Sequence, residues 1–423
     1  MRHITIQECY ESLKIGNSVG NHVISSREAD ELYEHIIKEK LDKDNIVWSR
    51  DTITFINYVG YIRLSTIEIE ILPKVSINSS TPEIERKVLL NMLVRCGILK
   101  VNYSELSNLN NYKISLNEIL ALLFAKKLQR ELSKGPYQEY IYVEDNSAAL
   151  KGSLVVNAQI KNISSNNPKA FCRYEEFSMD NTLNQIFSYV VRVLLKEVIN
   201  PETLKLLRHA QGCFVDITER EISTIEITNY KFNRLNSRFE ETFILAKMII
   251  NGYSSLGQSG SNKSFSILFK MNEIFEKYIY RIVQRTFDEA TIHLGHSKYR
   301  LLKNEDTNKG IFNLIPDIVI EKDGKEIIII DTKWKSISGY YNRHGVKRND
   351  IYQMYAYLTR YKSVKSVILL YPRNENVEEG ANGYLESWYL EDNIDKKIRV
   401  YTVDLDSEIK TIESITRIIE ENK

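Results

Sequence analysis

The sequence predicts an α/β protein, α+β overall, in which an N-terminal domain of mixed strands and helices precedes a domain with a central mixed sheet flanked by helices. Two patterns indicate this architecture. Apolar residues recur with a period of two in some segments and with helical spacing in others, and the strongest strand pair, residues 314–335, lies between two helical segments. A chain of 423 residues is long enough for two or three domains with separate cores.

The composition excludes several classes of protein. Hydrophobic residues make up 43% and charged residues 27% of the chain, an ordinary globular balance. The net charge of +1 gives no general attraction to nucleic acid, so any DNA-binding surface must be a local patch. The four cysteines form no C-x-x-C pair, which argues against a zinc site or a disulfide framework. With no apolar signal core and no run of membrane length, we expect a soluble, cytoplasmic protein.

The first part of the chain mixes strands and helices. Residues 67–75 alternate almost perfectly between apolar and other residues, which predicts a half-exposed strand. Pro73 places this strand at a sheet edge or ends it there. Ser26 is a candidate N-cap for the first helix. The expected strands cover residues 4–6, 52–64 and 67–75, and the expected helices cover 26–40, 82–96 and 115–133.

A segment rich in glycine and serine, residues 254–264, separates the two predicted domains. Such composition is typical of a flexible connection or an exposed loop. We therefore predict an N-terminal domain over residues 1–254 and a second domain over residues 255–423. Upstream of this segment we expect extended chain over 139–160 and 224–228, and helices over 180–199 and 234–250.

Residues 314–335 have the pattern of a β-hairpin, because two β-branched apolar runs flank an Asp323-Gly324 turn. The run Ile327–Ile330 is apolar on both faces, as expected for a strand buried between helices. Asp331 and Lys333 follow this run two residues apart, so they share one face of the strand.

A third charged residue of the hairpin, Asp317, meets Asp331 only in one register. A two-residue turn would pair Asp317 with Ile330 and direct the two carboxylates to opposite faces. A three-residue loop, with glycine in a left-handed conformation, would pair Asp317 with Asp331. A bulge near Pro316 would have the same effect.

These three residues predict a metal site. Hard divalent cations prefer carboxylate oxygens, and Mg²⁺ takes one or two of them from a protein. Asp317 and Asp331 are therefore the expected metal ligands, and Lys333 would lie beside the metal to orient a water or a phosphate oxygen. This pattern resembles that of the PD-(D/E)xK nucleases. The alternative is that the charges are merely solvated strand ends.

Three further residues are candidates for the same site. Glu276, on an expected helix over residues 271–279, is a further acid that would act on the metal directly or through water; alternatively it is a solvated helix glutamate. Gln353 and Tyr357 lie four residues apart on one face of a following helix. They would hold DNA phosphate or order the site, or they would simply form a packed helix face.

Landmarks over most of the chain resemble McrC, the nuclease subunit of the McrBC modification-dependent restriction system. They agree with that family in order and spacing, which makes the resemblance more specific than the metal motif alone. The segments that carry it are Gly60–Leu64, Glu70–Val75, Leu150–Leu154, Tyr174–Asn184, Phe275–Glu276, Pro316–Asp317, Asp331–Lys335 and Tyr352–Tyr357.

The resemblance implies a Mg²⁺-dependent DNA endonuclease, with Mn²⁺ as the alternative metal, in a GTP-dependent restriction complex of the 5-methylcytosine type. The implied partner is a hexameric AAA+ GTPase of the McrB type, which reads modified cytosine in double-stranded DNA. The N-terminal domain would bind this ring and stimulate GTP hydrolysis. The nuclease domain is also a candidate for dimerisation.

The chain has no G-x-x-x-x-G-K-[ST] motif, so we expect it to bind no nucleotide itself and GTP to be bound by the partner. Two other functions stay open at this point. One is a non-catalytic DNA-binding adaptor that regulates an AAA+ ring, and the other is a stand-alone repair-type exonuclease.

Overall fold

The computed structural model describes residues 1–16, 20–74, 81–101, 114–253, 264–374, 377 and 383–423. Backbone contacts group Met1–Lys113 with Ser261–Lys423 in one compact unit, and Ile114–Gly260 form a second unit. Most of the predicted linker, residues 254–263, lies outside the described residues. The division into functional domains at residues 254 and 255 stays a prediction.

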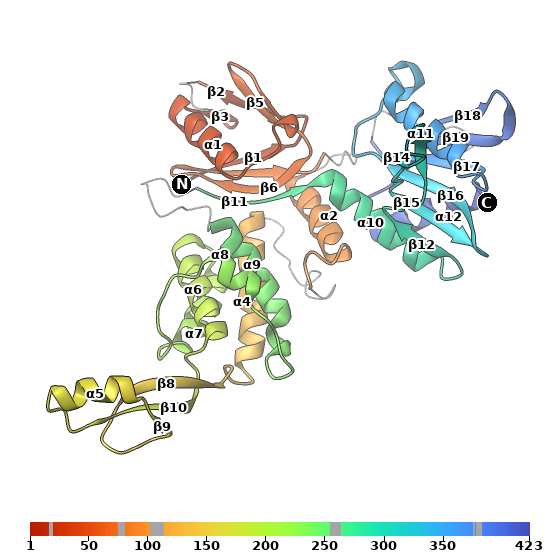
Figure 1. Ribbon diagram of the computed structural model, residues 1–423. Coiled ribbons are helices and arrows are strands. Elements are labelled where there is room, and N and C mark those ends of the chain that lie inside the picture. The colour runs from red at the N-terminus through yellow and green to blue at the C-terminus, as the bar shows by residue number, and fades with distance from the viewer. Residues whose placement is uncertain (17–19, 75–80, 102–113, 254–263, 375–376, 378–382) are drawn as a thin grey trace. The chain divides into compact units, whose positions relative to one another are not determined.

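The first sheet of the first unit joins segments that are far apart in the sequence (Figure 1). β1 is parallel to β7, β6 is antiparallel to β7, and β11 is antiparallel to β6. β11 leads directly into helix α10 (Met271–Thr286), so this sheet is continuous with an element of the predicted site. The strands, in spatial order, are β1 (Arg2–Gln7), β7 (Ile67–Leu72), β6 (Tyr58–Arg63) and β11 (Phe265–Lys270).

A second, smaller sheet shares its core with helix α1 (Ser26–Lys38) and the first sheet. Ser25, not the expected Ser26, is the N-cap of α1, and it forms a capping box with Glu28. The strands, in spatial order, are β3 (Val23–Ile24), β2 (Leu13–Ile15), β5 (Thr52–Phe55) and β4 (Ile46–Trp48).

The strand predicted over residues 67–75 is present as β7, but the prediction that it is half-exposed was wrong. β7 lies between β1 and β6, and nearly all of its side chains are buried. The misleading residue is Glu70, which is fully buried and accepts hydrogen bonds from Arg86 Nε (2.8 Å) and Nη2 (2.6 Å) of helix α2 (Pro82–Arg95). A carboxylate paired in this way can lie in a core without an unsatisfied charge. Pro73 follows the strand, which ends at Leu72 as expected.

The large sheet of the first unit is mixed and lies between helices (Figure 1). β16 pairs antiparallel with β15 and parallel with β17. Helix α11 shares a core with one face of this sheet, while α10 packs against β16 and α12 packs against β19. The strand order is β12 (Thr291–Leu294), β15 (Ile318–Lys322), β16 (Lys325–Thr332), β17 (Ser366–Pro372), β19 (Asn393–Val403) and β18 (Glu386–Leu390), with α11 at Arg348–Arg360 and α12 at Glu408–Glu420. A mixed α/β fold is thereby confirmed.

A two-stranded hairpin is separate from this sheet. It consists of β13 (Arg300–Lys303) and β14 (Gly310–Asn313), paired antiparallel.

The second unit combines helices with a three-stranded sheet. The sheet has the order β8-β10-β9, and α5 packs on β10. Its elements are α4 (Leu116–Leu132), β8 (Glu139–Ser147), β9 (Ser153–Leu154), α5 (Val156–Ser164), β10 (Ala170–Ser178), α6 (Thr182–Glu197), α7 (Pro201–Gly212), α8 (Thr224–Asn229) and α9 (Glu240–Tyr253). Residues 224–228, expected to be extended, form helix α8 instead, because Ser223 and Glu226 make a capping box that starts a helix.

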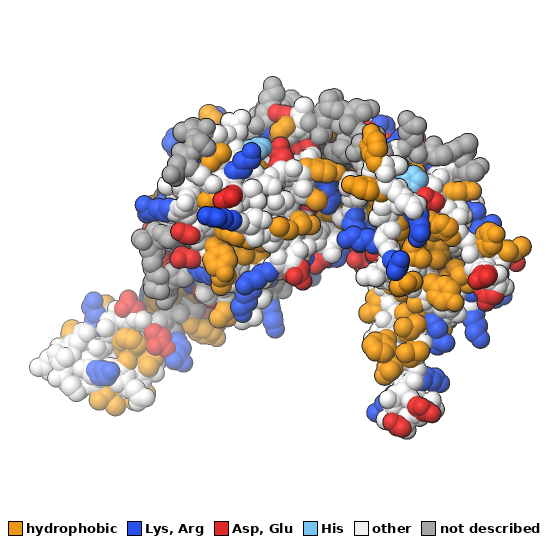
Figure 2. Space-filling model, turned by 90° about the horizontal axis from the view of Figure 1, so that it is seen from above, with side chains coloured by type: hydrophobic (Ala, Val, Ile, Leu, Met, Phe, Trp, Pro, Cys, Tyr) orange, Lys and Arg blue, Asp and Glu red, His pale blue; other side chains and the backbone are white. Residues whose placement is uncertain are grey.

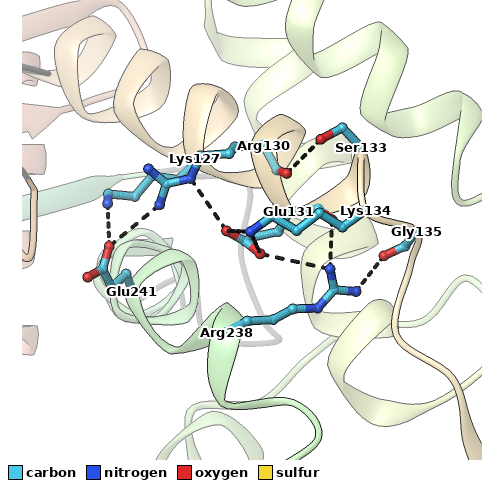
Figure 3. A network of polar contacts seen from close by, with 8 residues as sticks. All are labelled: Lys127, Arg130, Glu131, Ser133, Lys134, Gly135, Arg238 and Glu241. Atoms are coloured by element: carbon cyan, nitrogen blue, oxygen red, sulfur yellow. Dashed lines mark hydrogen bonds and ion pairs between the residues drawn. The ribbon is translucent and has the colours of Figure 1, made fainter.

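A polar network fixes the end of α4, where the chain turns toward β8 (Figure 3). Glu131 is buried and binds Lys134 Nζ at 3.0 and 3.1 Å. Arg238 donates to the carbonyl oxygens of Glu131 (3.2 Å) and Gly135 (2.6 Å). An arginine that binds the last carbonyls of a helix satisfies acceptors that have no partner within the helix.

None of the helices in the described part of the chain is both long and apolar enough to cross a membrane.

Gly60 allows β11 to approach β6. Its φ is +134°, and a Cβ at this position would overlap the carbonyl oxygen of Ile267. We expect Gly60→Ala to lower the free energy of unfolding by about 3 kcal/mol or more, because the methyl group forces the strands apart. Thermal melting of the full chain measures this change. The matched control is Gly16→Ala in the same unit, where a Cβ would meet only an ordinary contact at 3.9 Å; an equal loss in both variants would contradict the prediction.

Candidate functional site

The register of the β15–β16 hairpin brings the positions of the two acidic residues together. The turn has two residues, Asp323 and Gly324, both with positive φ (52° and 75°), as in type I′ turns. Glu321 pairs with Glu326, but Ile320 pairs with Ile328, so Ile327 is an extra residue in β16 and forms a bulge. Beyond the bulge Ile318 pairs with Ile330, and the register continued by one residue sets Asp317 opposite Asp331. The predictions of a three-residue loop and, alternatively, of a bulge near Pro316 were wrong. The register that either would have given, with Asp317 opposite Asp331, is nevertheless present.

Asp331 is a buried carboxylate at the end of an apolar strand. It is fully buried, and its Oδ2 forms an ion pair with Lys333 Nζ. No described residue donates a hydrogen bond to its Oδ1. Burial and the nearby charge of Asp317 raise the pKa of Asp331, and Lys333 opposes this shift. The site therefore holds more negative charge than one ammonium group stabilises well.

Asp317 is oriented by the backbone and side chain of Thr332. Its Oδ2 accepts hydrogen bonds from Thr332 N (2.7 Å) and Thr332 Oγ1 (2.8 Å). Sequence reasoning did not single out Thr332, although it stands between the two charged residues of the motif. The hydrogen bonds leave the other oxygen of Asp317 available to a ligand.

A chain of hydrogen bonds leads from Lys333 into helix α11. Lys333 Nζ donates to Gln353 Oε1 (3.2 Å), Gln353 Nε2 donates to Tyr357 OH (2.8 Å), and Tyr357 OH donates to the carbonyl oxygen of Ile315 (3.0 Å). The structure thus places both helix residues beside Lys333. Burial opposes the charge of Lys333, but the ion pair with Asp331 outweighs it and raises the pKa of the ammonium group.

Glu276 lies half-buried on α10, near the same charges. Burial, and then the charge of Asp317, raise the pKa of Glu276 from 4.5 to about 7. Lys333 lowers it by a smaller amount. A carboxyl group with such a pKa can take up or release a proton near neutral pH.

The expected metal ligands suit a cation, although they do not supply a complete coordination sphere. Among the described residues, no three His, Cys, Asp or Glu side chains are grouped so that they could hold a metal ion. Mg²⁺ needs only one or two carboxylates, with waters and substrate phosphates completing its coordination. Asp331, with its buried Oδ1 lacking a donor, and the adjacent Asp317 supply that donor set. The assignment of Asp317, Asp331 and Glu276 as metal ligands stays a prediction.

Sequence reasoning missed a second charged pair beside the site. Asp350, buried near the N-terminus of α11, accepts from Lys335 Nζ at 3.1 Å through both carboxylate oxygens. Tyr371 OH of β17 is 3.5 Å from Asp350 Oδ2. The charge of Asp350 contributes to the raised pKa of Asp331. The available signal was the acidic residue in the first turn of a helix, a position where the helix dipole stabilises a carboxylate.

Trp334 packs in the core, as the alternation of the strand predicts. Its ring lies 5.2 Å from that of Phe275, measured between centroids. Its Nε1 donates to Oε1 of Glu8 at 2.6 Å, and Glu8 follows β1 in the first sheet. Glu8 is fully buried, and burial raises its pKa. No sequence signal links these two residues, which are 326 positions apart.

The fold and the site define a mixed α/β protein in which one buried strand of the central sheet presents an acid and a lysine beside a second acid. A family model described as McrBC 5-methylcytosine restriction system component matches residues 53–372. Because this match covers well over half of the sequence, the chain belongs to that family. The resemblance noted in the sequence is thereby confirmed.

Two solved structures are similar to this chain. One is a chain of the refined half-complex from the tetradecameric assembly of Thermococcus gammatolerans McrB AAA+ hexamers with bound McrC; it has 21% identity and a TM-score of 0.76, over 98% of this chain and 100% of that chain. The other is a chain of the cryo-EM structure of the Thermococcus gammatolerans McrBC complex, with 25% identity and a TM-score of 0.53, over 70% of this chain and 89% of that chain. At 21% identity the first likeness shows the fold alone. No curated protein matches this chain.

The raised pKa of Glu276 predicts a pH-dependent effect of Glu276→Gln. The pKa in the folded state lies above the unfolded value, so the folded state binds more protons between pH 4.5 and about 7 and loses stability as the pH rises through that window. The variant cannot ionise. We therefore expect the difference in Tm between Glu276→Gln and the unmodified chain to grow in favour of the variant from pH 4.5 to about 7 and then to level off.

Thermal melts in a series of buffers without divalent cations measure this difference. Glu305→Gln, at an exposed position, is the control and should show a constant difference. A difference for Glu276→Gln that shrinks as the pH rises would show that its carboxyl group is stabilised in the charged form.

Proposed function

We propose that this chain is the DNA endonuclease subunit of a GTP-dependent restriction complex that acts on DNA with modified cytosine, of the 5-methylcytosine type. The observation that carries the proposal is the set of Asp317, Asp331 and Lys333 at one end of the β15–β16 hairpin, in a mixed sheet between helices. This set fits the pattern of the PD-(D/E)xK nucleases and supports the proposal. Membership of the McrBC component family supports it independently.

The chain's own residues would perform three tasks during phosphodiester hydrolysis. Asp317 and Asp331 would hold Mg²⁺, or Mn²⁺ in its place, with Glu276 as a further ligand directly or through water. When bound, the metal would polarise the scissile phosphate and lower the pKa of the attacking water. Lys333, fixed between Asp331 and Gln353, would orient that water and neutralise charge that develops on the phosphate oxygens.

Glu276, Gln353 and Tyr357 would support this chemistry. The half-buried carboxyl group of Glu276, with a pKa of about 7, can accept a proton close to the reacting water. Gln353 and Tyr357 hold the ammonium group of Lys333 through hydrogen bonds that end on a backbone carbonyl, so the lysine stays oriented before DNA arrives. Such preorganisation avoids a reordering cost during the reaction.

The proposed partner is a hexameric AAA+ GTPase of the McrB type. The similar structure from Thermococcus gammatolerans is an assembly of McrB AAA+ hexamers with bound McrC. GTP would be bound by the partner, which would also read the modified base in double-stranded DNA. A pair of nuclease domains in the assembled complex would account for cleavage of both strands.

We further propose that the β8–β10 pair in the second unit contacts the ring, within the predicted N-terminal domain of residues 1–254. Tyr140 is opposite Phe177 in this strand pair, and Tyr142 is two residues further along β8. All three side chains are exposed, Tyr142 by 73%. Exposed aromatic side chains grouped on one face are typical of protein interfaces.

Asp331→Asn and Lys333→Ala should separate cleavage from GTPase stimulation. With the partner, GTP, Mg²⁺ and methylated plasmid present, each variant should cleave at least about a thousandfold more slowly, since each removes a group that acts on the phosphate or the metal. Stimulation of the partner's GTPase should persist. Asp323→Asn at the turn of the same hairpin is the matched control, because asparagine tolerates the positive φ found there.

Plasmid cleavage, GTPase rate and Tm are measured on the same preparations. Normal cleavage by folded Asp331→Asn would refute the site and leave the adaptor function. Loss of both activities in a folded protein would show that cutting and GTPase stimulation are not divided as proposed. Site-specific cutting without the partner would instead favour the autonomous exonuclease.

The double variant Tyr140→Ser, Tyr142→Ser tests the ring contact. We expect it to lose most GTPase stimulation, by about tenfold or more, while its Tm stays within a degree or two, because both side chains are exposed in the free chain. Ile199→Ser, which is 83% exposed elsewhere in the second unit, is the control and should stimulate normally. Full stimulation by the double variant would place the contact on another surface.

A further inference from the structure

The β13–β14 hairpin exposes apolar side chains directly beside the predicted cutting site. Phe312 is 65% exposed and Leu302 is 54% exposed, and Ile315, which follows the hairpin, is exposed as well. Figure 2 shows hydrophobic side chains next to lysines and arginines on the face of the molecule that it presents. Asp317 is only two residues beyond Ile315, so the chain passes from this apolar element straight into the acidic site.

Phe312 is strained as well as exposed. Its φ is +58°, in the left-handed region that bulky residues rarely adopt. The residue thus combines an unfavourable backbone conformation with an apolar ring that is mostly exposed to water. Strained residues of this kind concentrate at binding and catalytic sites.

The hairpin has a fixed position relative to the site residues. Arg360 Nε of α11 donates to the carbonyl oxygen of Arg300 in β13 (2.9 Å), and Leu314 N donates to the carbonyl oxygen of Tyr299 (3.1 Å). The carbonyl oxygen of Ile315 accepts from Tyr357, the same tyrosine that binds Gln353. These bonds hold the hairpin next to the residues of the predicted site, within reach of a polymer bound there.

The charges around the hairpin suit nucleic acid. Lys303 and Lys309 lie exposed at its outer end, and Arg343, Lys347 and Arg348 lie exposed in the segment that leads into α11. Glu305 and Asp306 in the intervening turn offset the charges of Lys303 and Lys309, so the net positive charge comes from Arg300 of β13 and from the segment that leads into α11. Basic side chains bind phosphates, whereas apolar side chains on a protruding element can enter the minor groove and part a base step.

We propose that the β13–β14 hairpin contacts duplex DNA next to the cut site, with Phe312 inserting as an apolar wedge into the minor groove and Leu302 and Ile315 lining its path. This inference rests on the proposed function. It commits to duplex DNA as the occupant, because the hairpin adjoins the acidic site and because the hairpin and the segment that leads into α11 both carry a net positive charge. A second copy of this chain is the alternative occupant that the experiment distinguishes.

Phe312→Gly separates binding from stability. Glycine removes the ring and also adopts the positive φ without strain, so the Tm of the full chain should stay equal or rise. The Kd for a short fluorescein-labelled duplex, measured by anisotropy in Ca²⁺ so that the DNA is not cut, should rise by about tenfold. The dependence of Kd on salt should keep its slope, because no phosphate contact is lost.

Two controls lie on the same hairpin. Asn308→Gly also replaces a residue with positive φ (51°) and should leave Kd unchanged. Lys303→Ala should reduce the salt slope by about one, as expected for loss of one phosphate contact.

An unchanged Kd for Phe312→Gly would overturn the proposal, as would failure of the unmodified chain to bind the duplex at low salt. Conversion of a dimer to a monomer by Phe312→Gly, seen by light scattering with Kd unchanged, would assign the hairpin to contact with a second copy. Because binding is measured without cleavage, failure of the nuclease assignment would appear only in the Asp331→Asn cleavage assay and not in these measurements.

Discussion

One extra residue in β16 decides whether the site exists. With the two-residue turn at Asp323-Gly324, a regular hairpin would pair Asp317 with Ile330 and direct Asp317 and Asp331 to opposite faces. The bulge at Ile327 shifts the register by one residue, and both carboxylates then share the face that α11 covers. The hydrogen bonds of Lys333, Gln353 and Tyr357 lie on the same face. These three residues therefore lie beside both carboxylates only in that register.

The site concentrates charge where water is largely excluded, and its neighbours show how that charge is tolerated. Asp331 relies on Lys333, and Asp317 relies on the backbone and hydroxyl of Thr332. Asp350 is paired with Lys335 a short distance away. The pairing of Asp331 with Lys333 is partial, because the pKa of Asp331 remains raised, and the pKa of the nearby Glu276 is raised as well. Incomplete compensation of buried carboxylates favours the binding of a cation over the empty state.

The sequence allowed the hairpin, its two flanking helices and the set of site residues to be predicted, because turn chemistry and apolar periodicity are local signals. The bulge at Ile327 was not predictable, since the isoleucine run is uniform and gives no mark of the extra residue. Burial of Glu70 depends on Arg86 in another element, and the bond between Glu8 and Trp334 joins distant positions. Helix α8, by contrast, had a local signal in Ser223 and Glu226 that was outweighed by its β-branched residues.

The first unit consists of two stretches of chain, Met1–Lys113 and Ser261–Lys423, and they contact each other at residues that flank the site. Trp334 follows Lys333 directly and packs on Phe275, which precedes Glu276. The indole of Trp334 is bound in turn by Glu8, at the end of β1. β11 adds a second connection, because it pairs with β6 in the first sheet and continues into α10. The first sheet and the acidic site are therefore connected through close packing and buried hydrogen bonds, which resist gradual deformation. The segment that carries Lys333 and the helix that carries Glu276 are thus both anchored on the first sheet, through Glu8 and through β11.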